Sequence, residues 1–326
     1  MRTFIQTIIW IFVALIAAVG VFLLYVNISL PDVEDAPDIS IKSSSERLQR
    51  GEYLANNVMV CVSCHSPRDW SQYAAPVVKG KLGAGGSVFG HEKNLPGEFY
   101  PANLTPYHLG SWTDGEILRA ISSGVTRDGK PMFPIMPYHS YAKLDREDLY
   151  SVIAYLRTLP PIESESRKSK ADFPVNIIMN FMPSDPEFSE RPDTSDKIEY
   201  GKYLVTAAAC AECHTPLDDG KPVDSLRFAG GMEFKLKSGG YATSSNITPD
   251  KQTGIGSWTE EAFVRKFKSF LDPEYQDEKI IPGSINTEMP WREYAGLKES
   301  DLKAMFAYLR SLKPVKHKVI KFKPSN

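Results

Sequence analysis

The sequence contains 326 residues, of which 42% are hydrophobic and 24% are charged, and its formal net charge is −2. This composition excludes a disordered or collagen-like chain, and the length leaves room for two ordinary domains with connecting segments. The balanced charge lacks the basic surface that holds a polyanion, so we do not expect nucleic acid as a partner.

The N-terminal segment, residues 1–27, is predicted to be a transmembrane anchor. Residues 8–26 contain neither a charge nor a side-chain amide, and about 20 such residues cross the apolar core of a bilayer as a helix. A cleaved signal peptide is the alternative, but the run is long for a signal core and no small-residue cleavage pattern follows it. Arg2 precedes the run and acidic residues follow it, which places the remainder on the periplasmic or extracytoplasmic side of the cytoplasmic membrane. Residues 28–45 are predicted to be a flexible linker.

The rest of the sequence repeats itself once, with its motifs in the same order. The matching pairs are GEYL at 51–54 with GKYL at 201–204, CVSCHSP at 61–67 with CAECHTP at 210–216, NLTP at 103–106 with NITP at 246–249, GSWT at 110–113 and 256–259, MPY at 136–138 with MPW at 289–291, and AYLR at 154–157 and 307–310. Such similarity indicates two copies of one domain, at 46–160 (copy 1) and 196–312 (copy 2).

Each copy is predicted to be mainly α-helical. A helix leads into the CxxCH motif, a long stretch rich in Gly and Pro follows, and further helices come after Trp112 or Trp258 and at the end of the copy. Thr113 and Glu116 have the spacing of a capping box. The final helices each carry an apolar face, formed by Leu149, Val152, Ile153 and Leu156 and by Leu302, Met305, Phe306 and Leu309. The long irregular middle indicates that a large buried cofactor completes each core.

Two segments lie outside the copies. Residues 161–195 are predicted to link them, and the apolar stretch 173–179 within this linker is expected to pack across a domain surface. Residues 313–326 form a basic C-terminal tail.

The CxxCH motifs carry the chemistry. Cys61 and Cys64, and likewise Cys210 and Cys213, are one helical turn apart, so both thiols of a pair can add to the vinyl groups of one haem while the adjoining His65 or His214 ligates its iron. A zinc site and a thioredoxin-like thiol pair are the alternatives, but neither needs the histidine that follows both pairs. We therefore predict two covalently bound haem c groups. The carbonyls of Pro67 and Pro216 are candidates to accept a hydrogen bond from the outer N–H of each histidine.

The second axial ligand of each iron is predicted to be a methionine. Met136 and Met289 coincide when the copies are aligned, whereas Met132 pairs with Ile285 and the spare histidines of copy 1 have no histidine partner. Ligation by a thioether leaves no open position on the iron, which favours electron transfer over substrate binding.

Other repeated polar residues are candidates for cofactor contacts. Trp112 and Trp258, and Arg119 and Arg265, could donate to haem propionates, although a packed indole and a solvated helix face would explain them too. Asn103 and Asn246 are expected to build a turn. Tyr53 and Tyr203 are expected to pack the first helix of a copy against its last helix, and no chemistry is assigned to them.

With these motifs the sequence resembles the membrane-bound multihaem c-type cytochromes that serve as electron-transfer subunits of periplasmic alcohol, gluconate and related dehydrogenases. The pattern C-x-x-C-H-[ST]-P, N-[LI]-T-P, G-S-W-T, M-P-[YW] and A-Y-L-R carries this resemblance over most of residues 46–312. The resemblance implies a class I cytochrome c fold for each copy, with His65 and Met136 on one iron and His214 and Met289 on the other. Those subunits often carry three haems and a C-terminal membrane segment, whereas this chain has two CxxCH motifs and an N-terminal apolar run.

The function predicted from the sequence is electron transfer. We expect a membrane-anchored dihaem cytochrome that takes electrons from a dehydrogenase or quinol-oxidising partner and passes them to a downstream cytochrome or terminal oxidase, as a subunit rather than as a stand-alone enzyme. A dihaem peroxidase or thiosulfate-oxidising cytochrome is the alternative, and it would need an open or unusual iron ligand. A redox or gas sensor is disfavoured because no output module follows the copies.

Overall fold

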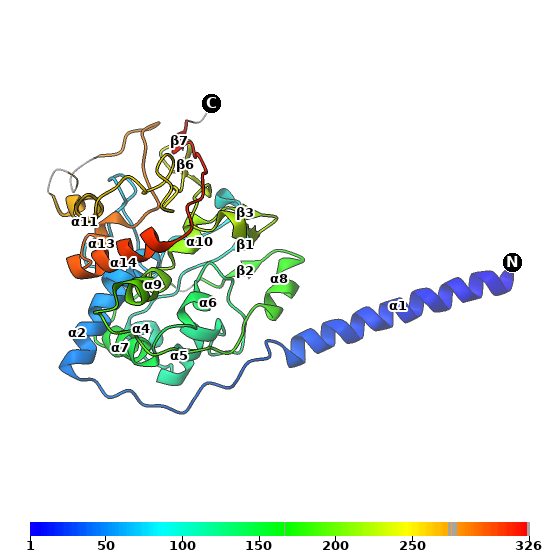
Figure 1. Ribbon diagram of the computed structural model, residues 1–326. Coiled ribbons are helices and arrows are strands. Elements are labelled where there is room, and N and C mark those ends of the chain that lie inside the picture. The colour runs from blue at the N-terminus through cyan, green and yellow to red at the C-terminus, as the bar shows by residue number, and fades with distance from the viewer. Residues whose placement is uncertain (166, 273–274, 276–278, 325–326) are drawn as a thin grey trace.

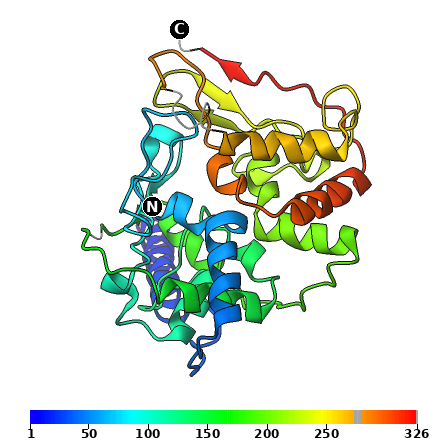
Figure 2. The ribbon, with the colours of Figure 1, turned by 90° about the vertical axis from the view of Figure 1, so that its left-hand side faces the viewer.

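The computed structural model describes residues 1–165, 167–272, 275 and 279–324. A long N-terminal helix projects from a body built of two helical copies that lie side by side (Figures 1 and 2). In copy 1 the helices are α2 (Ser45–Tyr53), the π-helical η1 (Leu54–Val58), α3 (Cys61–Cys64), the 3-10 helix η2 (His91–Lys93), α4 (Pro106–Leu109), α5 (Asp114–Ser123), α6 (Tyr138–Tyr141) and α7 (Arg146–Leu156). The predicted capping box is present at the start of α5, where Thr113 and Glu116 bind each other's backbone N–H groups.

Copy 2 repeats this order. Its helices are α9 (Lys197–Ala207), α10 (Cys210–His214), the 3-10 helix η4 (Asp224–Leu226), α11 (Glu260–Lys268), the 3-10 helix η5 (Ser269–Leu271), α13 (Trp291–Tyr294) and α14 (Glu299–Ser311). Between the copies lie α8 (Val175–Ile178) and the 3-10 helix η3 (Met179–Phe181). The strands form small antiparallel sheets, in which β1 (Gly97–Glu98) pairs with β2 (Lys170–Ala171), β3 (Leu217–Asp218) with β4 (Lys221–Pro222), and β6 (Tyr241–Thr243) with both β5 (Glu233–Lys235) and β7 (Phe322–Lys323). The prediction of a mainly helical protein is confirmed.

In each copy the first and last helices cross at a glycine. A Cβ atom added to Gly51 of α2 would lie 1.9 Å from the carbonyl oxygen of Ser151 in α7. The same atom on Gly201 of α9 would lie 1.9 Å from the carbonyl oxygen of Ala304 in α14. Only glycine permits these backbones to come so close, and this explains why GEYL and GKYL keep their first residue.

The copies hold each other through a reciprocal pair of hydrogen bonds. The Tyr53 hydroxyl of copy 1 donates to Asp301 in α14 at 2.7 Å, and the Tyr203 hydroxyl of copy 2 donates to Asp148 in α7 at 2.6 Å. The expectation that these tyrosines join first and last helices within a copy is therefore wrong for their hydroxyls, which bind the last helix of the other copy. The buried apolar residues of both copies also form one continuous cluster.

The segment that follows each final helix crosses back over its own copy. Asn103 donates from Nδ2 to the carbonyl oxygen of Ile162 at 2.7 Å, and Asn246 donates in the same way to Val315 at 2.8 Å. The linker after copy 1 and the basic tail after copy 2 thus begin as equivalent straps.

The N-terminal helix α1 (Arg2–Ser29) is the one helix among the described residues that is long and apolar enough to cross a membrane. Its side chains are largely exposed, and Val26 near its C-terminal end is its buried residue. The helix therefore exposes an apolar surface that the body does not cover.

Candidate functional site

The cysteine–histidine motifs lie on the short helices α3 and α10. Each helix follows a residue in the left-handed region, Val60 with φ 46° and Ala209 with φ 49°. The same turn therefore precedes both motifs. Because residues three apart share a helix face, the two thiols of each pair point the same way.

Each histidine is held through Nδ1 by a backbone carbonyl. The oxygen of Ala102 lies 2.8 Å from Nδ1 of His65, and that of Ser245 lies 2.7 Å from Nδ1 of His214. A carbonyl can only accept, so Nδ1 carries the proton and Nε2 presents its lone pair to a metal. Burial lowers the pKa of both imidazoles, which favours this neutral form.

The predicted role of the two prolines is wrong. The carbonyls of Pro67 and Pro216 accept from the backbone N–H of Val78 and Val223. These bonds close the turns after each motif, and the histidines bind the residue before each NxTP sequence instead.

The NxTP sequences fix those carbonyls. The Asn103 side-chain oxygen accepts from the backbone N–H of Thr105 at 2.8 Å and from its hydroxyl at 2.7 Å, and Asn246 and Thr248 form the same turn. The expected turn is confirmed. Nδ2 of each asparagine also donates to the strap that follows the final helix. One asparagine side chain therefore connects that strap with the carbonyl that orients the histidine.

All four cysteines are free thiols, of which Cys61 and Cys210 are partly buried and Cys64 and Cys213 are exposed. Desolvation raises the pKa of Cys61, Cys210 and Cys213 to about 12 and also raises that of Cys64. Within the described residues no three or more His, Cys, Asp or Glu side chains are grouped so that they could hold a metal ion.

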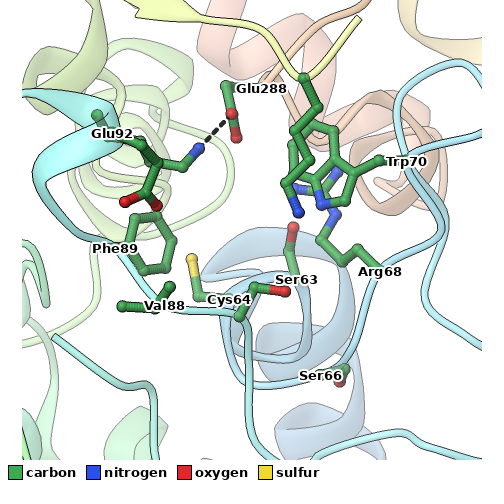
Figure 3. Close-up of a pocket in the computed structure, with 12 residues that line it drawn as sticks. Ser63, Cys64, Ser66, Arg68, Trp70, Val88, Phe89, Glu92 and Glu288 are labelled. Atoms are coloured by element: carbon green, nitrogen blue, oxygen red, sulfur yellow. Dashed lines mark hydrogen bonds and ion pairs between the residues drawn. The ribbon is translucent and has the colours of Figure 1, made fainter. Parts of the chain in front are cut away.

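The CxxCH motif of copy 1 borders copy 2. Cys64 points into a pocket of about 70 Å³ whose walls come from both copies (Figure 3). Across this pocket Lys93 of copy 1 pairs with Glu288 of copy 2 at 2.5 Å. Glu288 directly precedes Met289 in the chain, so a residue next to the predicted ligand of copy 2 lines the pocket.

Met136 and Met289 occupy equivalent positions. Each lies just before a short helix, α6 or α13, and packs partly buried against the core cluster. The carbonyl oxygen of each accepts from the residue two positions on, Tyr138 or Trp291, at 2.8 Å. Their ligation of iron remains a prediction.

The residues predicted to contact the haem propionates have different surroundings in the two copies. Trp112 is partly buried with Arg127 over its ring, whereas Trp258 is 37% exposed and Arg265 is exposed. Arg119 donates through Nη2 to the carbonyl of Thr126 at 2.9 Å. These four residues keep their predicted role as a proposal.

Two functional residues were missed in the sequence. Arg157 donates to the carbonyls of Leu109 and Trp112, and Arg310 donates to that of Gly256, so each holds the GSWT loop of its copy. The signal was present, because both arginines end the repeated AYLR motif.

The residues fit a covalently bound haem. Each copy offers a thiol pair on one helix face and a neutral histidine with Nε2 available. In copy 1 the Tyr138 hydroxyl, next to Met136, and Nε of Arg119 are buried without a hydrogen-bond partner within the described part of the chain. A buried unpaired donor costs about 1–3 kcal/mol, so a group from outside the chain would complete this copy.

Comparison with known proteins agrees with a covalently bound haem in each copy. The cytochrome c family profile matches residues 48–160 and 198–313. The cytochrome c subunit of the quinone alcohol dehydrogenase of Gluconacetobacter polyoxogenes is 29% identical over 290 residues, which cover 84% of this chain and 57% of that subunit. The fructose dehydrogenase cytochrome subunit of Gluconobacter japonicus is 27% identical, with 88% and 56% covered. A diheme cytochrome c-type protein of Cereibacter sphaeroides is 28% identical, with 77% and 81% covered. The chain thus spans little more than half the length of the dehydrogenase subunits.

Proposed function

The chain belongs to the cytochrome c family, and we propose that each copy holds one haem c and that the protein transfers electrons from a dehydrogenase or quinol-oxidising complex to a downstream cytochrome or oxidase. Haem held in this way supplies reversible one-electron chemistry at its iron. The observation that carries the proposal is the duplicated cysteine–histidine helix with Nδ1 of the histidine fixed by a carbonyl. The relatives named as cytochrome subunits of alcohol and fructose dehydrogenases support a dehydrogenase as the donor.

Within each copy we assign the holding residues by role. Cys61 and Cys64 form the covalent links in copy 1, and Cys210 and Cys213 form them in copy 2. His65 and His214 ligate through Nε2, with Met136 and Met289 as the opposite ligands. A closed pair of ligands at each iron favours a carrier over a catalyst. The pocket that Cys64 shares with Glu288 of copy 2 supports a relay between the copies.

A haem count and an axial-ligand assay test the proposal. The purified protein should contain two haems per chain and show the weak near-infrared band of methionine-to-iron ligation. Met136→Ala should reduce this band and open one iron to carbon monoxide. Met132→Ala is the matched control because Met132 is also partly buried in copy 1 but has no methionine counterpart, and it should leave the band unchanged. Peroxide turnover by the untouched protein with one five-coordinate iron would instead support the dihaem enzyme alternative.

We further propose that α1 anchors the protein in the cytoplasmic membrane with the body on the extracytoplasmic side. The exposed apolar surface of α1 supports this placement. The full chain should stay in the membrane through an alkaline carbonate wash and keep its N-terminus. A mature protein that begins after residue 26 and is released by salt would contradict the anchor.

A further inference from the structure

The linker between the copies carries an exposed apolar segment. Phe173 is 79% exposed, Ile178 is 47% exposed and Phe181 is 53% exposed, on and beside α8 and η3. The expectation that residues 173–179 pack across a domain surface is therefore wrong for the side chains of Phe173 and Ile178. From Phe173 to Ser184 the segment also contains no charged residue.

The segment, residues 173–184, is held at both ends by copy 1. On its N-terminal side β2 pairs with β1, and the backbone N–H of Asp172 donates to Pro96 at 2.9 Å. On its C-terminal side the hydroxyl of Ser189 donates to the carbonyl of Lys143 at 2.7 Å. The segment therefore projects as a closed loop whose position on copy 1 is fixed.

This loop touches the proposed anchor. The rings of Phe181 and Phe22 stack with centroids 6.5 Å apart and an interplanar angle of 11°. Farther along, the backbone N–H of Glu34 donates to Asp185 at 2.8 Å. Figure 1 shows α8 on the side of the body from which α1 departs. The loop and the end of α1 therefore lie side by side.

The contact between Phe22 and Phe181 indicates how deep the loop would lie in the membrane. Phe22 lies four residues before Val26, the last residue of the apolar run, which corresponds to about 6 Å along a helix. Apolar faces of interfacial helices reach about 5–10 Å into the boundary between headgroups and acyl chains. If α1 spans the bilayer, Phe181 is level with that boundary, and a charge-free loop is what such a position requires.

We propose that residues 173–184 insert into the membrane interface as a second contact beside α1 and so fix copy 1 against the bilayer. The occupant of the exposed face is lipid, because the face continues the apolar surface of α1. This inference rests on the proposed anchoring by α1. A single helix leaves the body free to turn about its linker, whereas two contacts restrain it.

Cysteine accessibility in vesicles tests the proposal. Ile178→Cys is compared with Ile198→Cys. Ile198 is 46% exposed and belongs to α9, a helix that lies away from α1 in both views (Figures 1 and 2). The full holoprotein is placed in vesicles of phosphatidylethanolamine and phosphatidylglycerol and treated with a membrane-impermeant maleimide. The reagent attacks thiolates in water, so Ile178→Cys should react at least about tenfold more slowly than Ile198→Cys. The parent protein should not react, since its own thiols are bound to haem.

A second measurement identifies what covers the loop. A phospholipid with a photoactivatable acyl chain should add to residues 173–184 and not to α9. Equal labelling of both variants in protein that resists carbonate would overturn the inference and leave the anchor standing. Protection found only in native membranes would assign the loop to a protein partner and overturn it as well. Release of the protein by carbonate would overturn the anchor and the inference together.

Discussion

Replacing Arg50 with methionine tests how strongly the buried carboxylate of Asp148 depends on its partners. The Asp148 side chain is 2% exposed and binds Arg50 through two hydrogen bonds, of 2.6 Å and 2.9 Å. Arg191 and Tyr203 also donate to it, at 2.9 Å and 2.6 Å. Removing one partner of a buried ion pair costs about 3–5 kcal/mol. Because two donors remain, we expect Arg50→Met to lower the free energy of unfolding by about 3 kcal/mol, at the lower end of that range.

The loss of unfolding free energy in Arg50→Met is predicted to depend on pH. Burial alone would raise the pKa of Asp148, but the hydrogen bonds and charge of Arg50, together with the Tyr203 hydroxyl and the charge of Arg191, outweigh it and hold that pKa below its usual value. A carboxylate with a lowered pKa in the folded state contributes stability above its unfolded value of about 3.9, and this contribution is lost as the pH falls through the folded value. The advantage of the parent protein over Arg50→Met should therefore be full above about pH 5 and shrink below about pH 4.

Urea unfolding of the holoprotein, followed by far-ultraviolet circular dichroism between pH 3 and 7, measures both effects. Arg47→Met is the matched control, because Arg47 also joins α2 to α7, through Glu147 at 2.7 Å, but that carboxylate is 62% exposed. An exposed pair is worth about 0–1 kcal/mol, so the control should change little. Equal losses in the two variants, or a loss at Arg50 that does not diminish in acid, would refute the assignment of the effect to the buried charge.

Two further changes address the helix crossing and the histidine support. Gly51→Ala should destabilise copy 1 by about 3 kcal/mol or more in urea unfolding, since the added Cβ would lie 1.9 Å from the Ser151 carbonyl oxygen. Gly129→Ala, with open space around it but φ +72°, should cost only about 1 kcal/mol, and a larger cost there than at Gly51 would contradict the close-contact argument. Asn103→Ala should shift the reduction potential of a single haem in a redox titration, because the carbonyl that orients His65 loses its support. An unchanged potential would show that the turn holds without the asparagine.

The sequence predicted what local pattern and repetition determine. The repeat located Cys61 and Cys210 on equivalent helices and placed Met136 opposite Met289 in the alignment. The spacing of Thr113 and Glu116 identified a capping box that the structure contains. Each of these features depends on residues that are near one another in the chain or that recur in register.

Contacts between distant residues were not predictable in this way. The partner of His65 is the carbonyl of Ala102, and nothing in the spacing distinguishes it from the nearer Pro67. The partner of Tyr53 is Asp301. Comparing the sequence with itself shows that the two copies are alike, but it does not show which copy supplies a given contact. The hydrogen bonds from each tyrosine hydroxyl to the other copy were therefore missed.

That exchange has an evolutionary consequence. A lone ancestral domain of this type would have lacked the tyrosine hydroxyl that the other copy supplies, and a symmetric dimer of such domains could have provided it reciprocally. After fusion, the tyrosine of one copy and the aspartate of the other are inherited together. Loss of the tyrosine in one copy leaves the aspartate of the other copy without that hydrogen bond. The two halves are therefore expected to have diverged by paired substitutions, and deleting one half would remove a hydrogen-bond donor from the buried aspartate of the other.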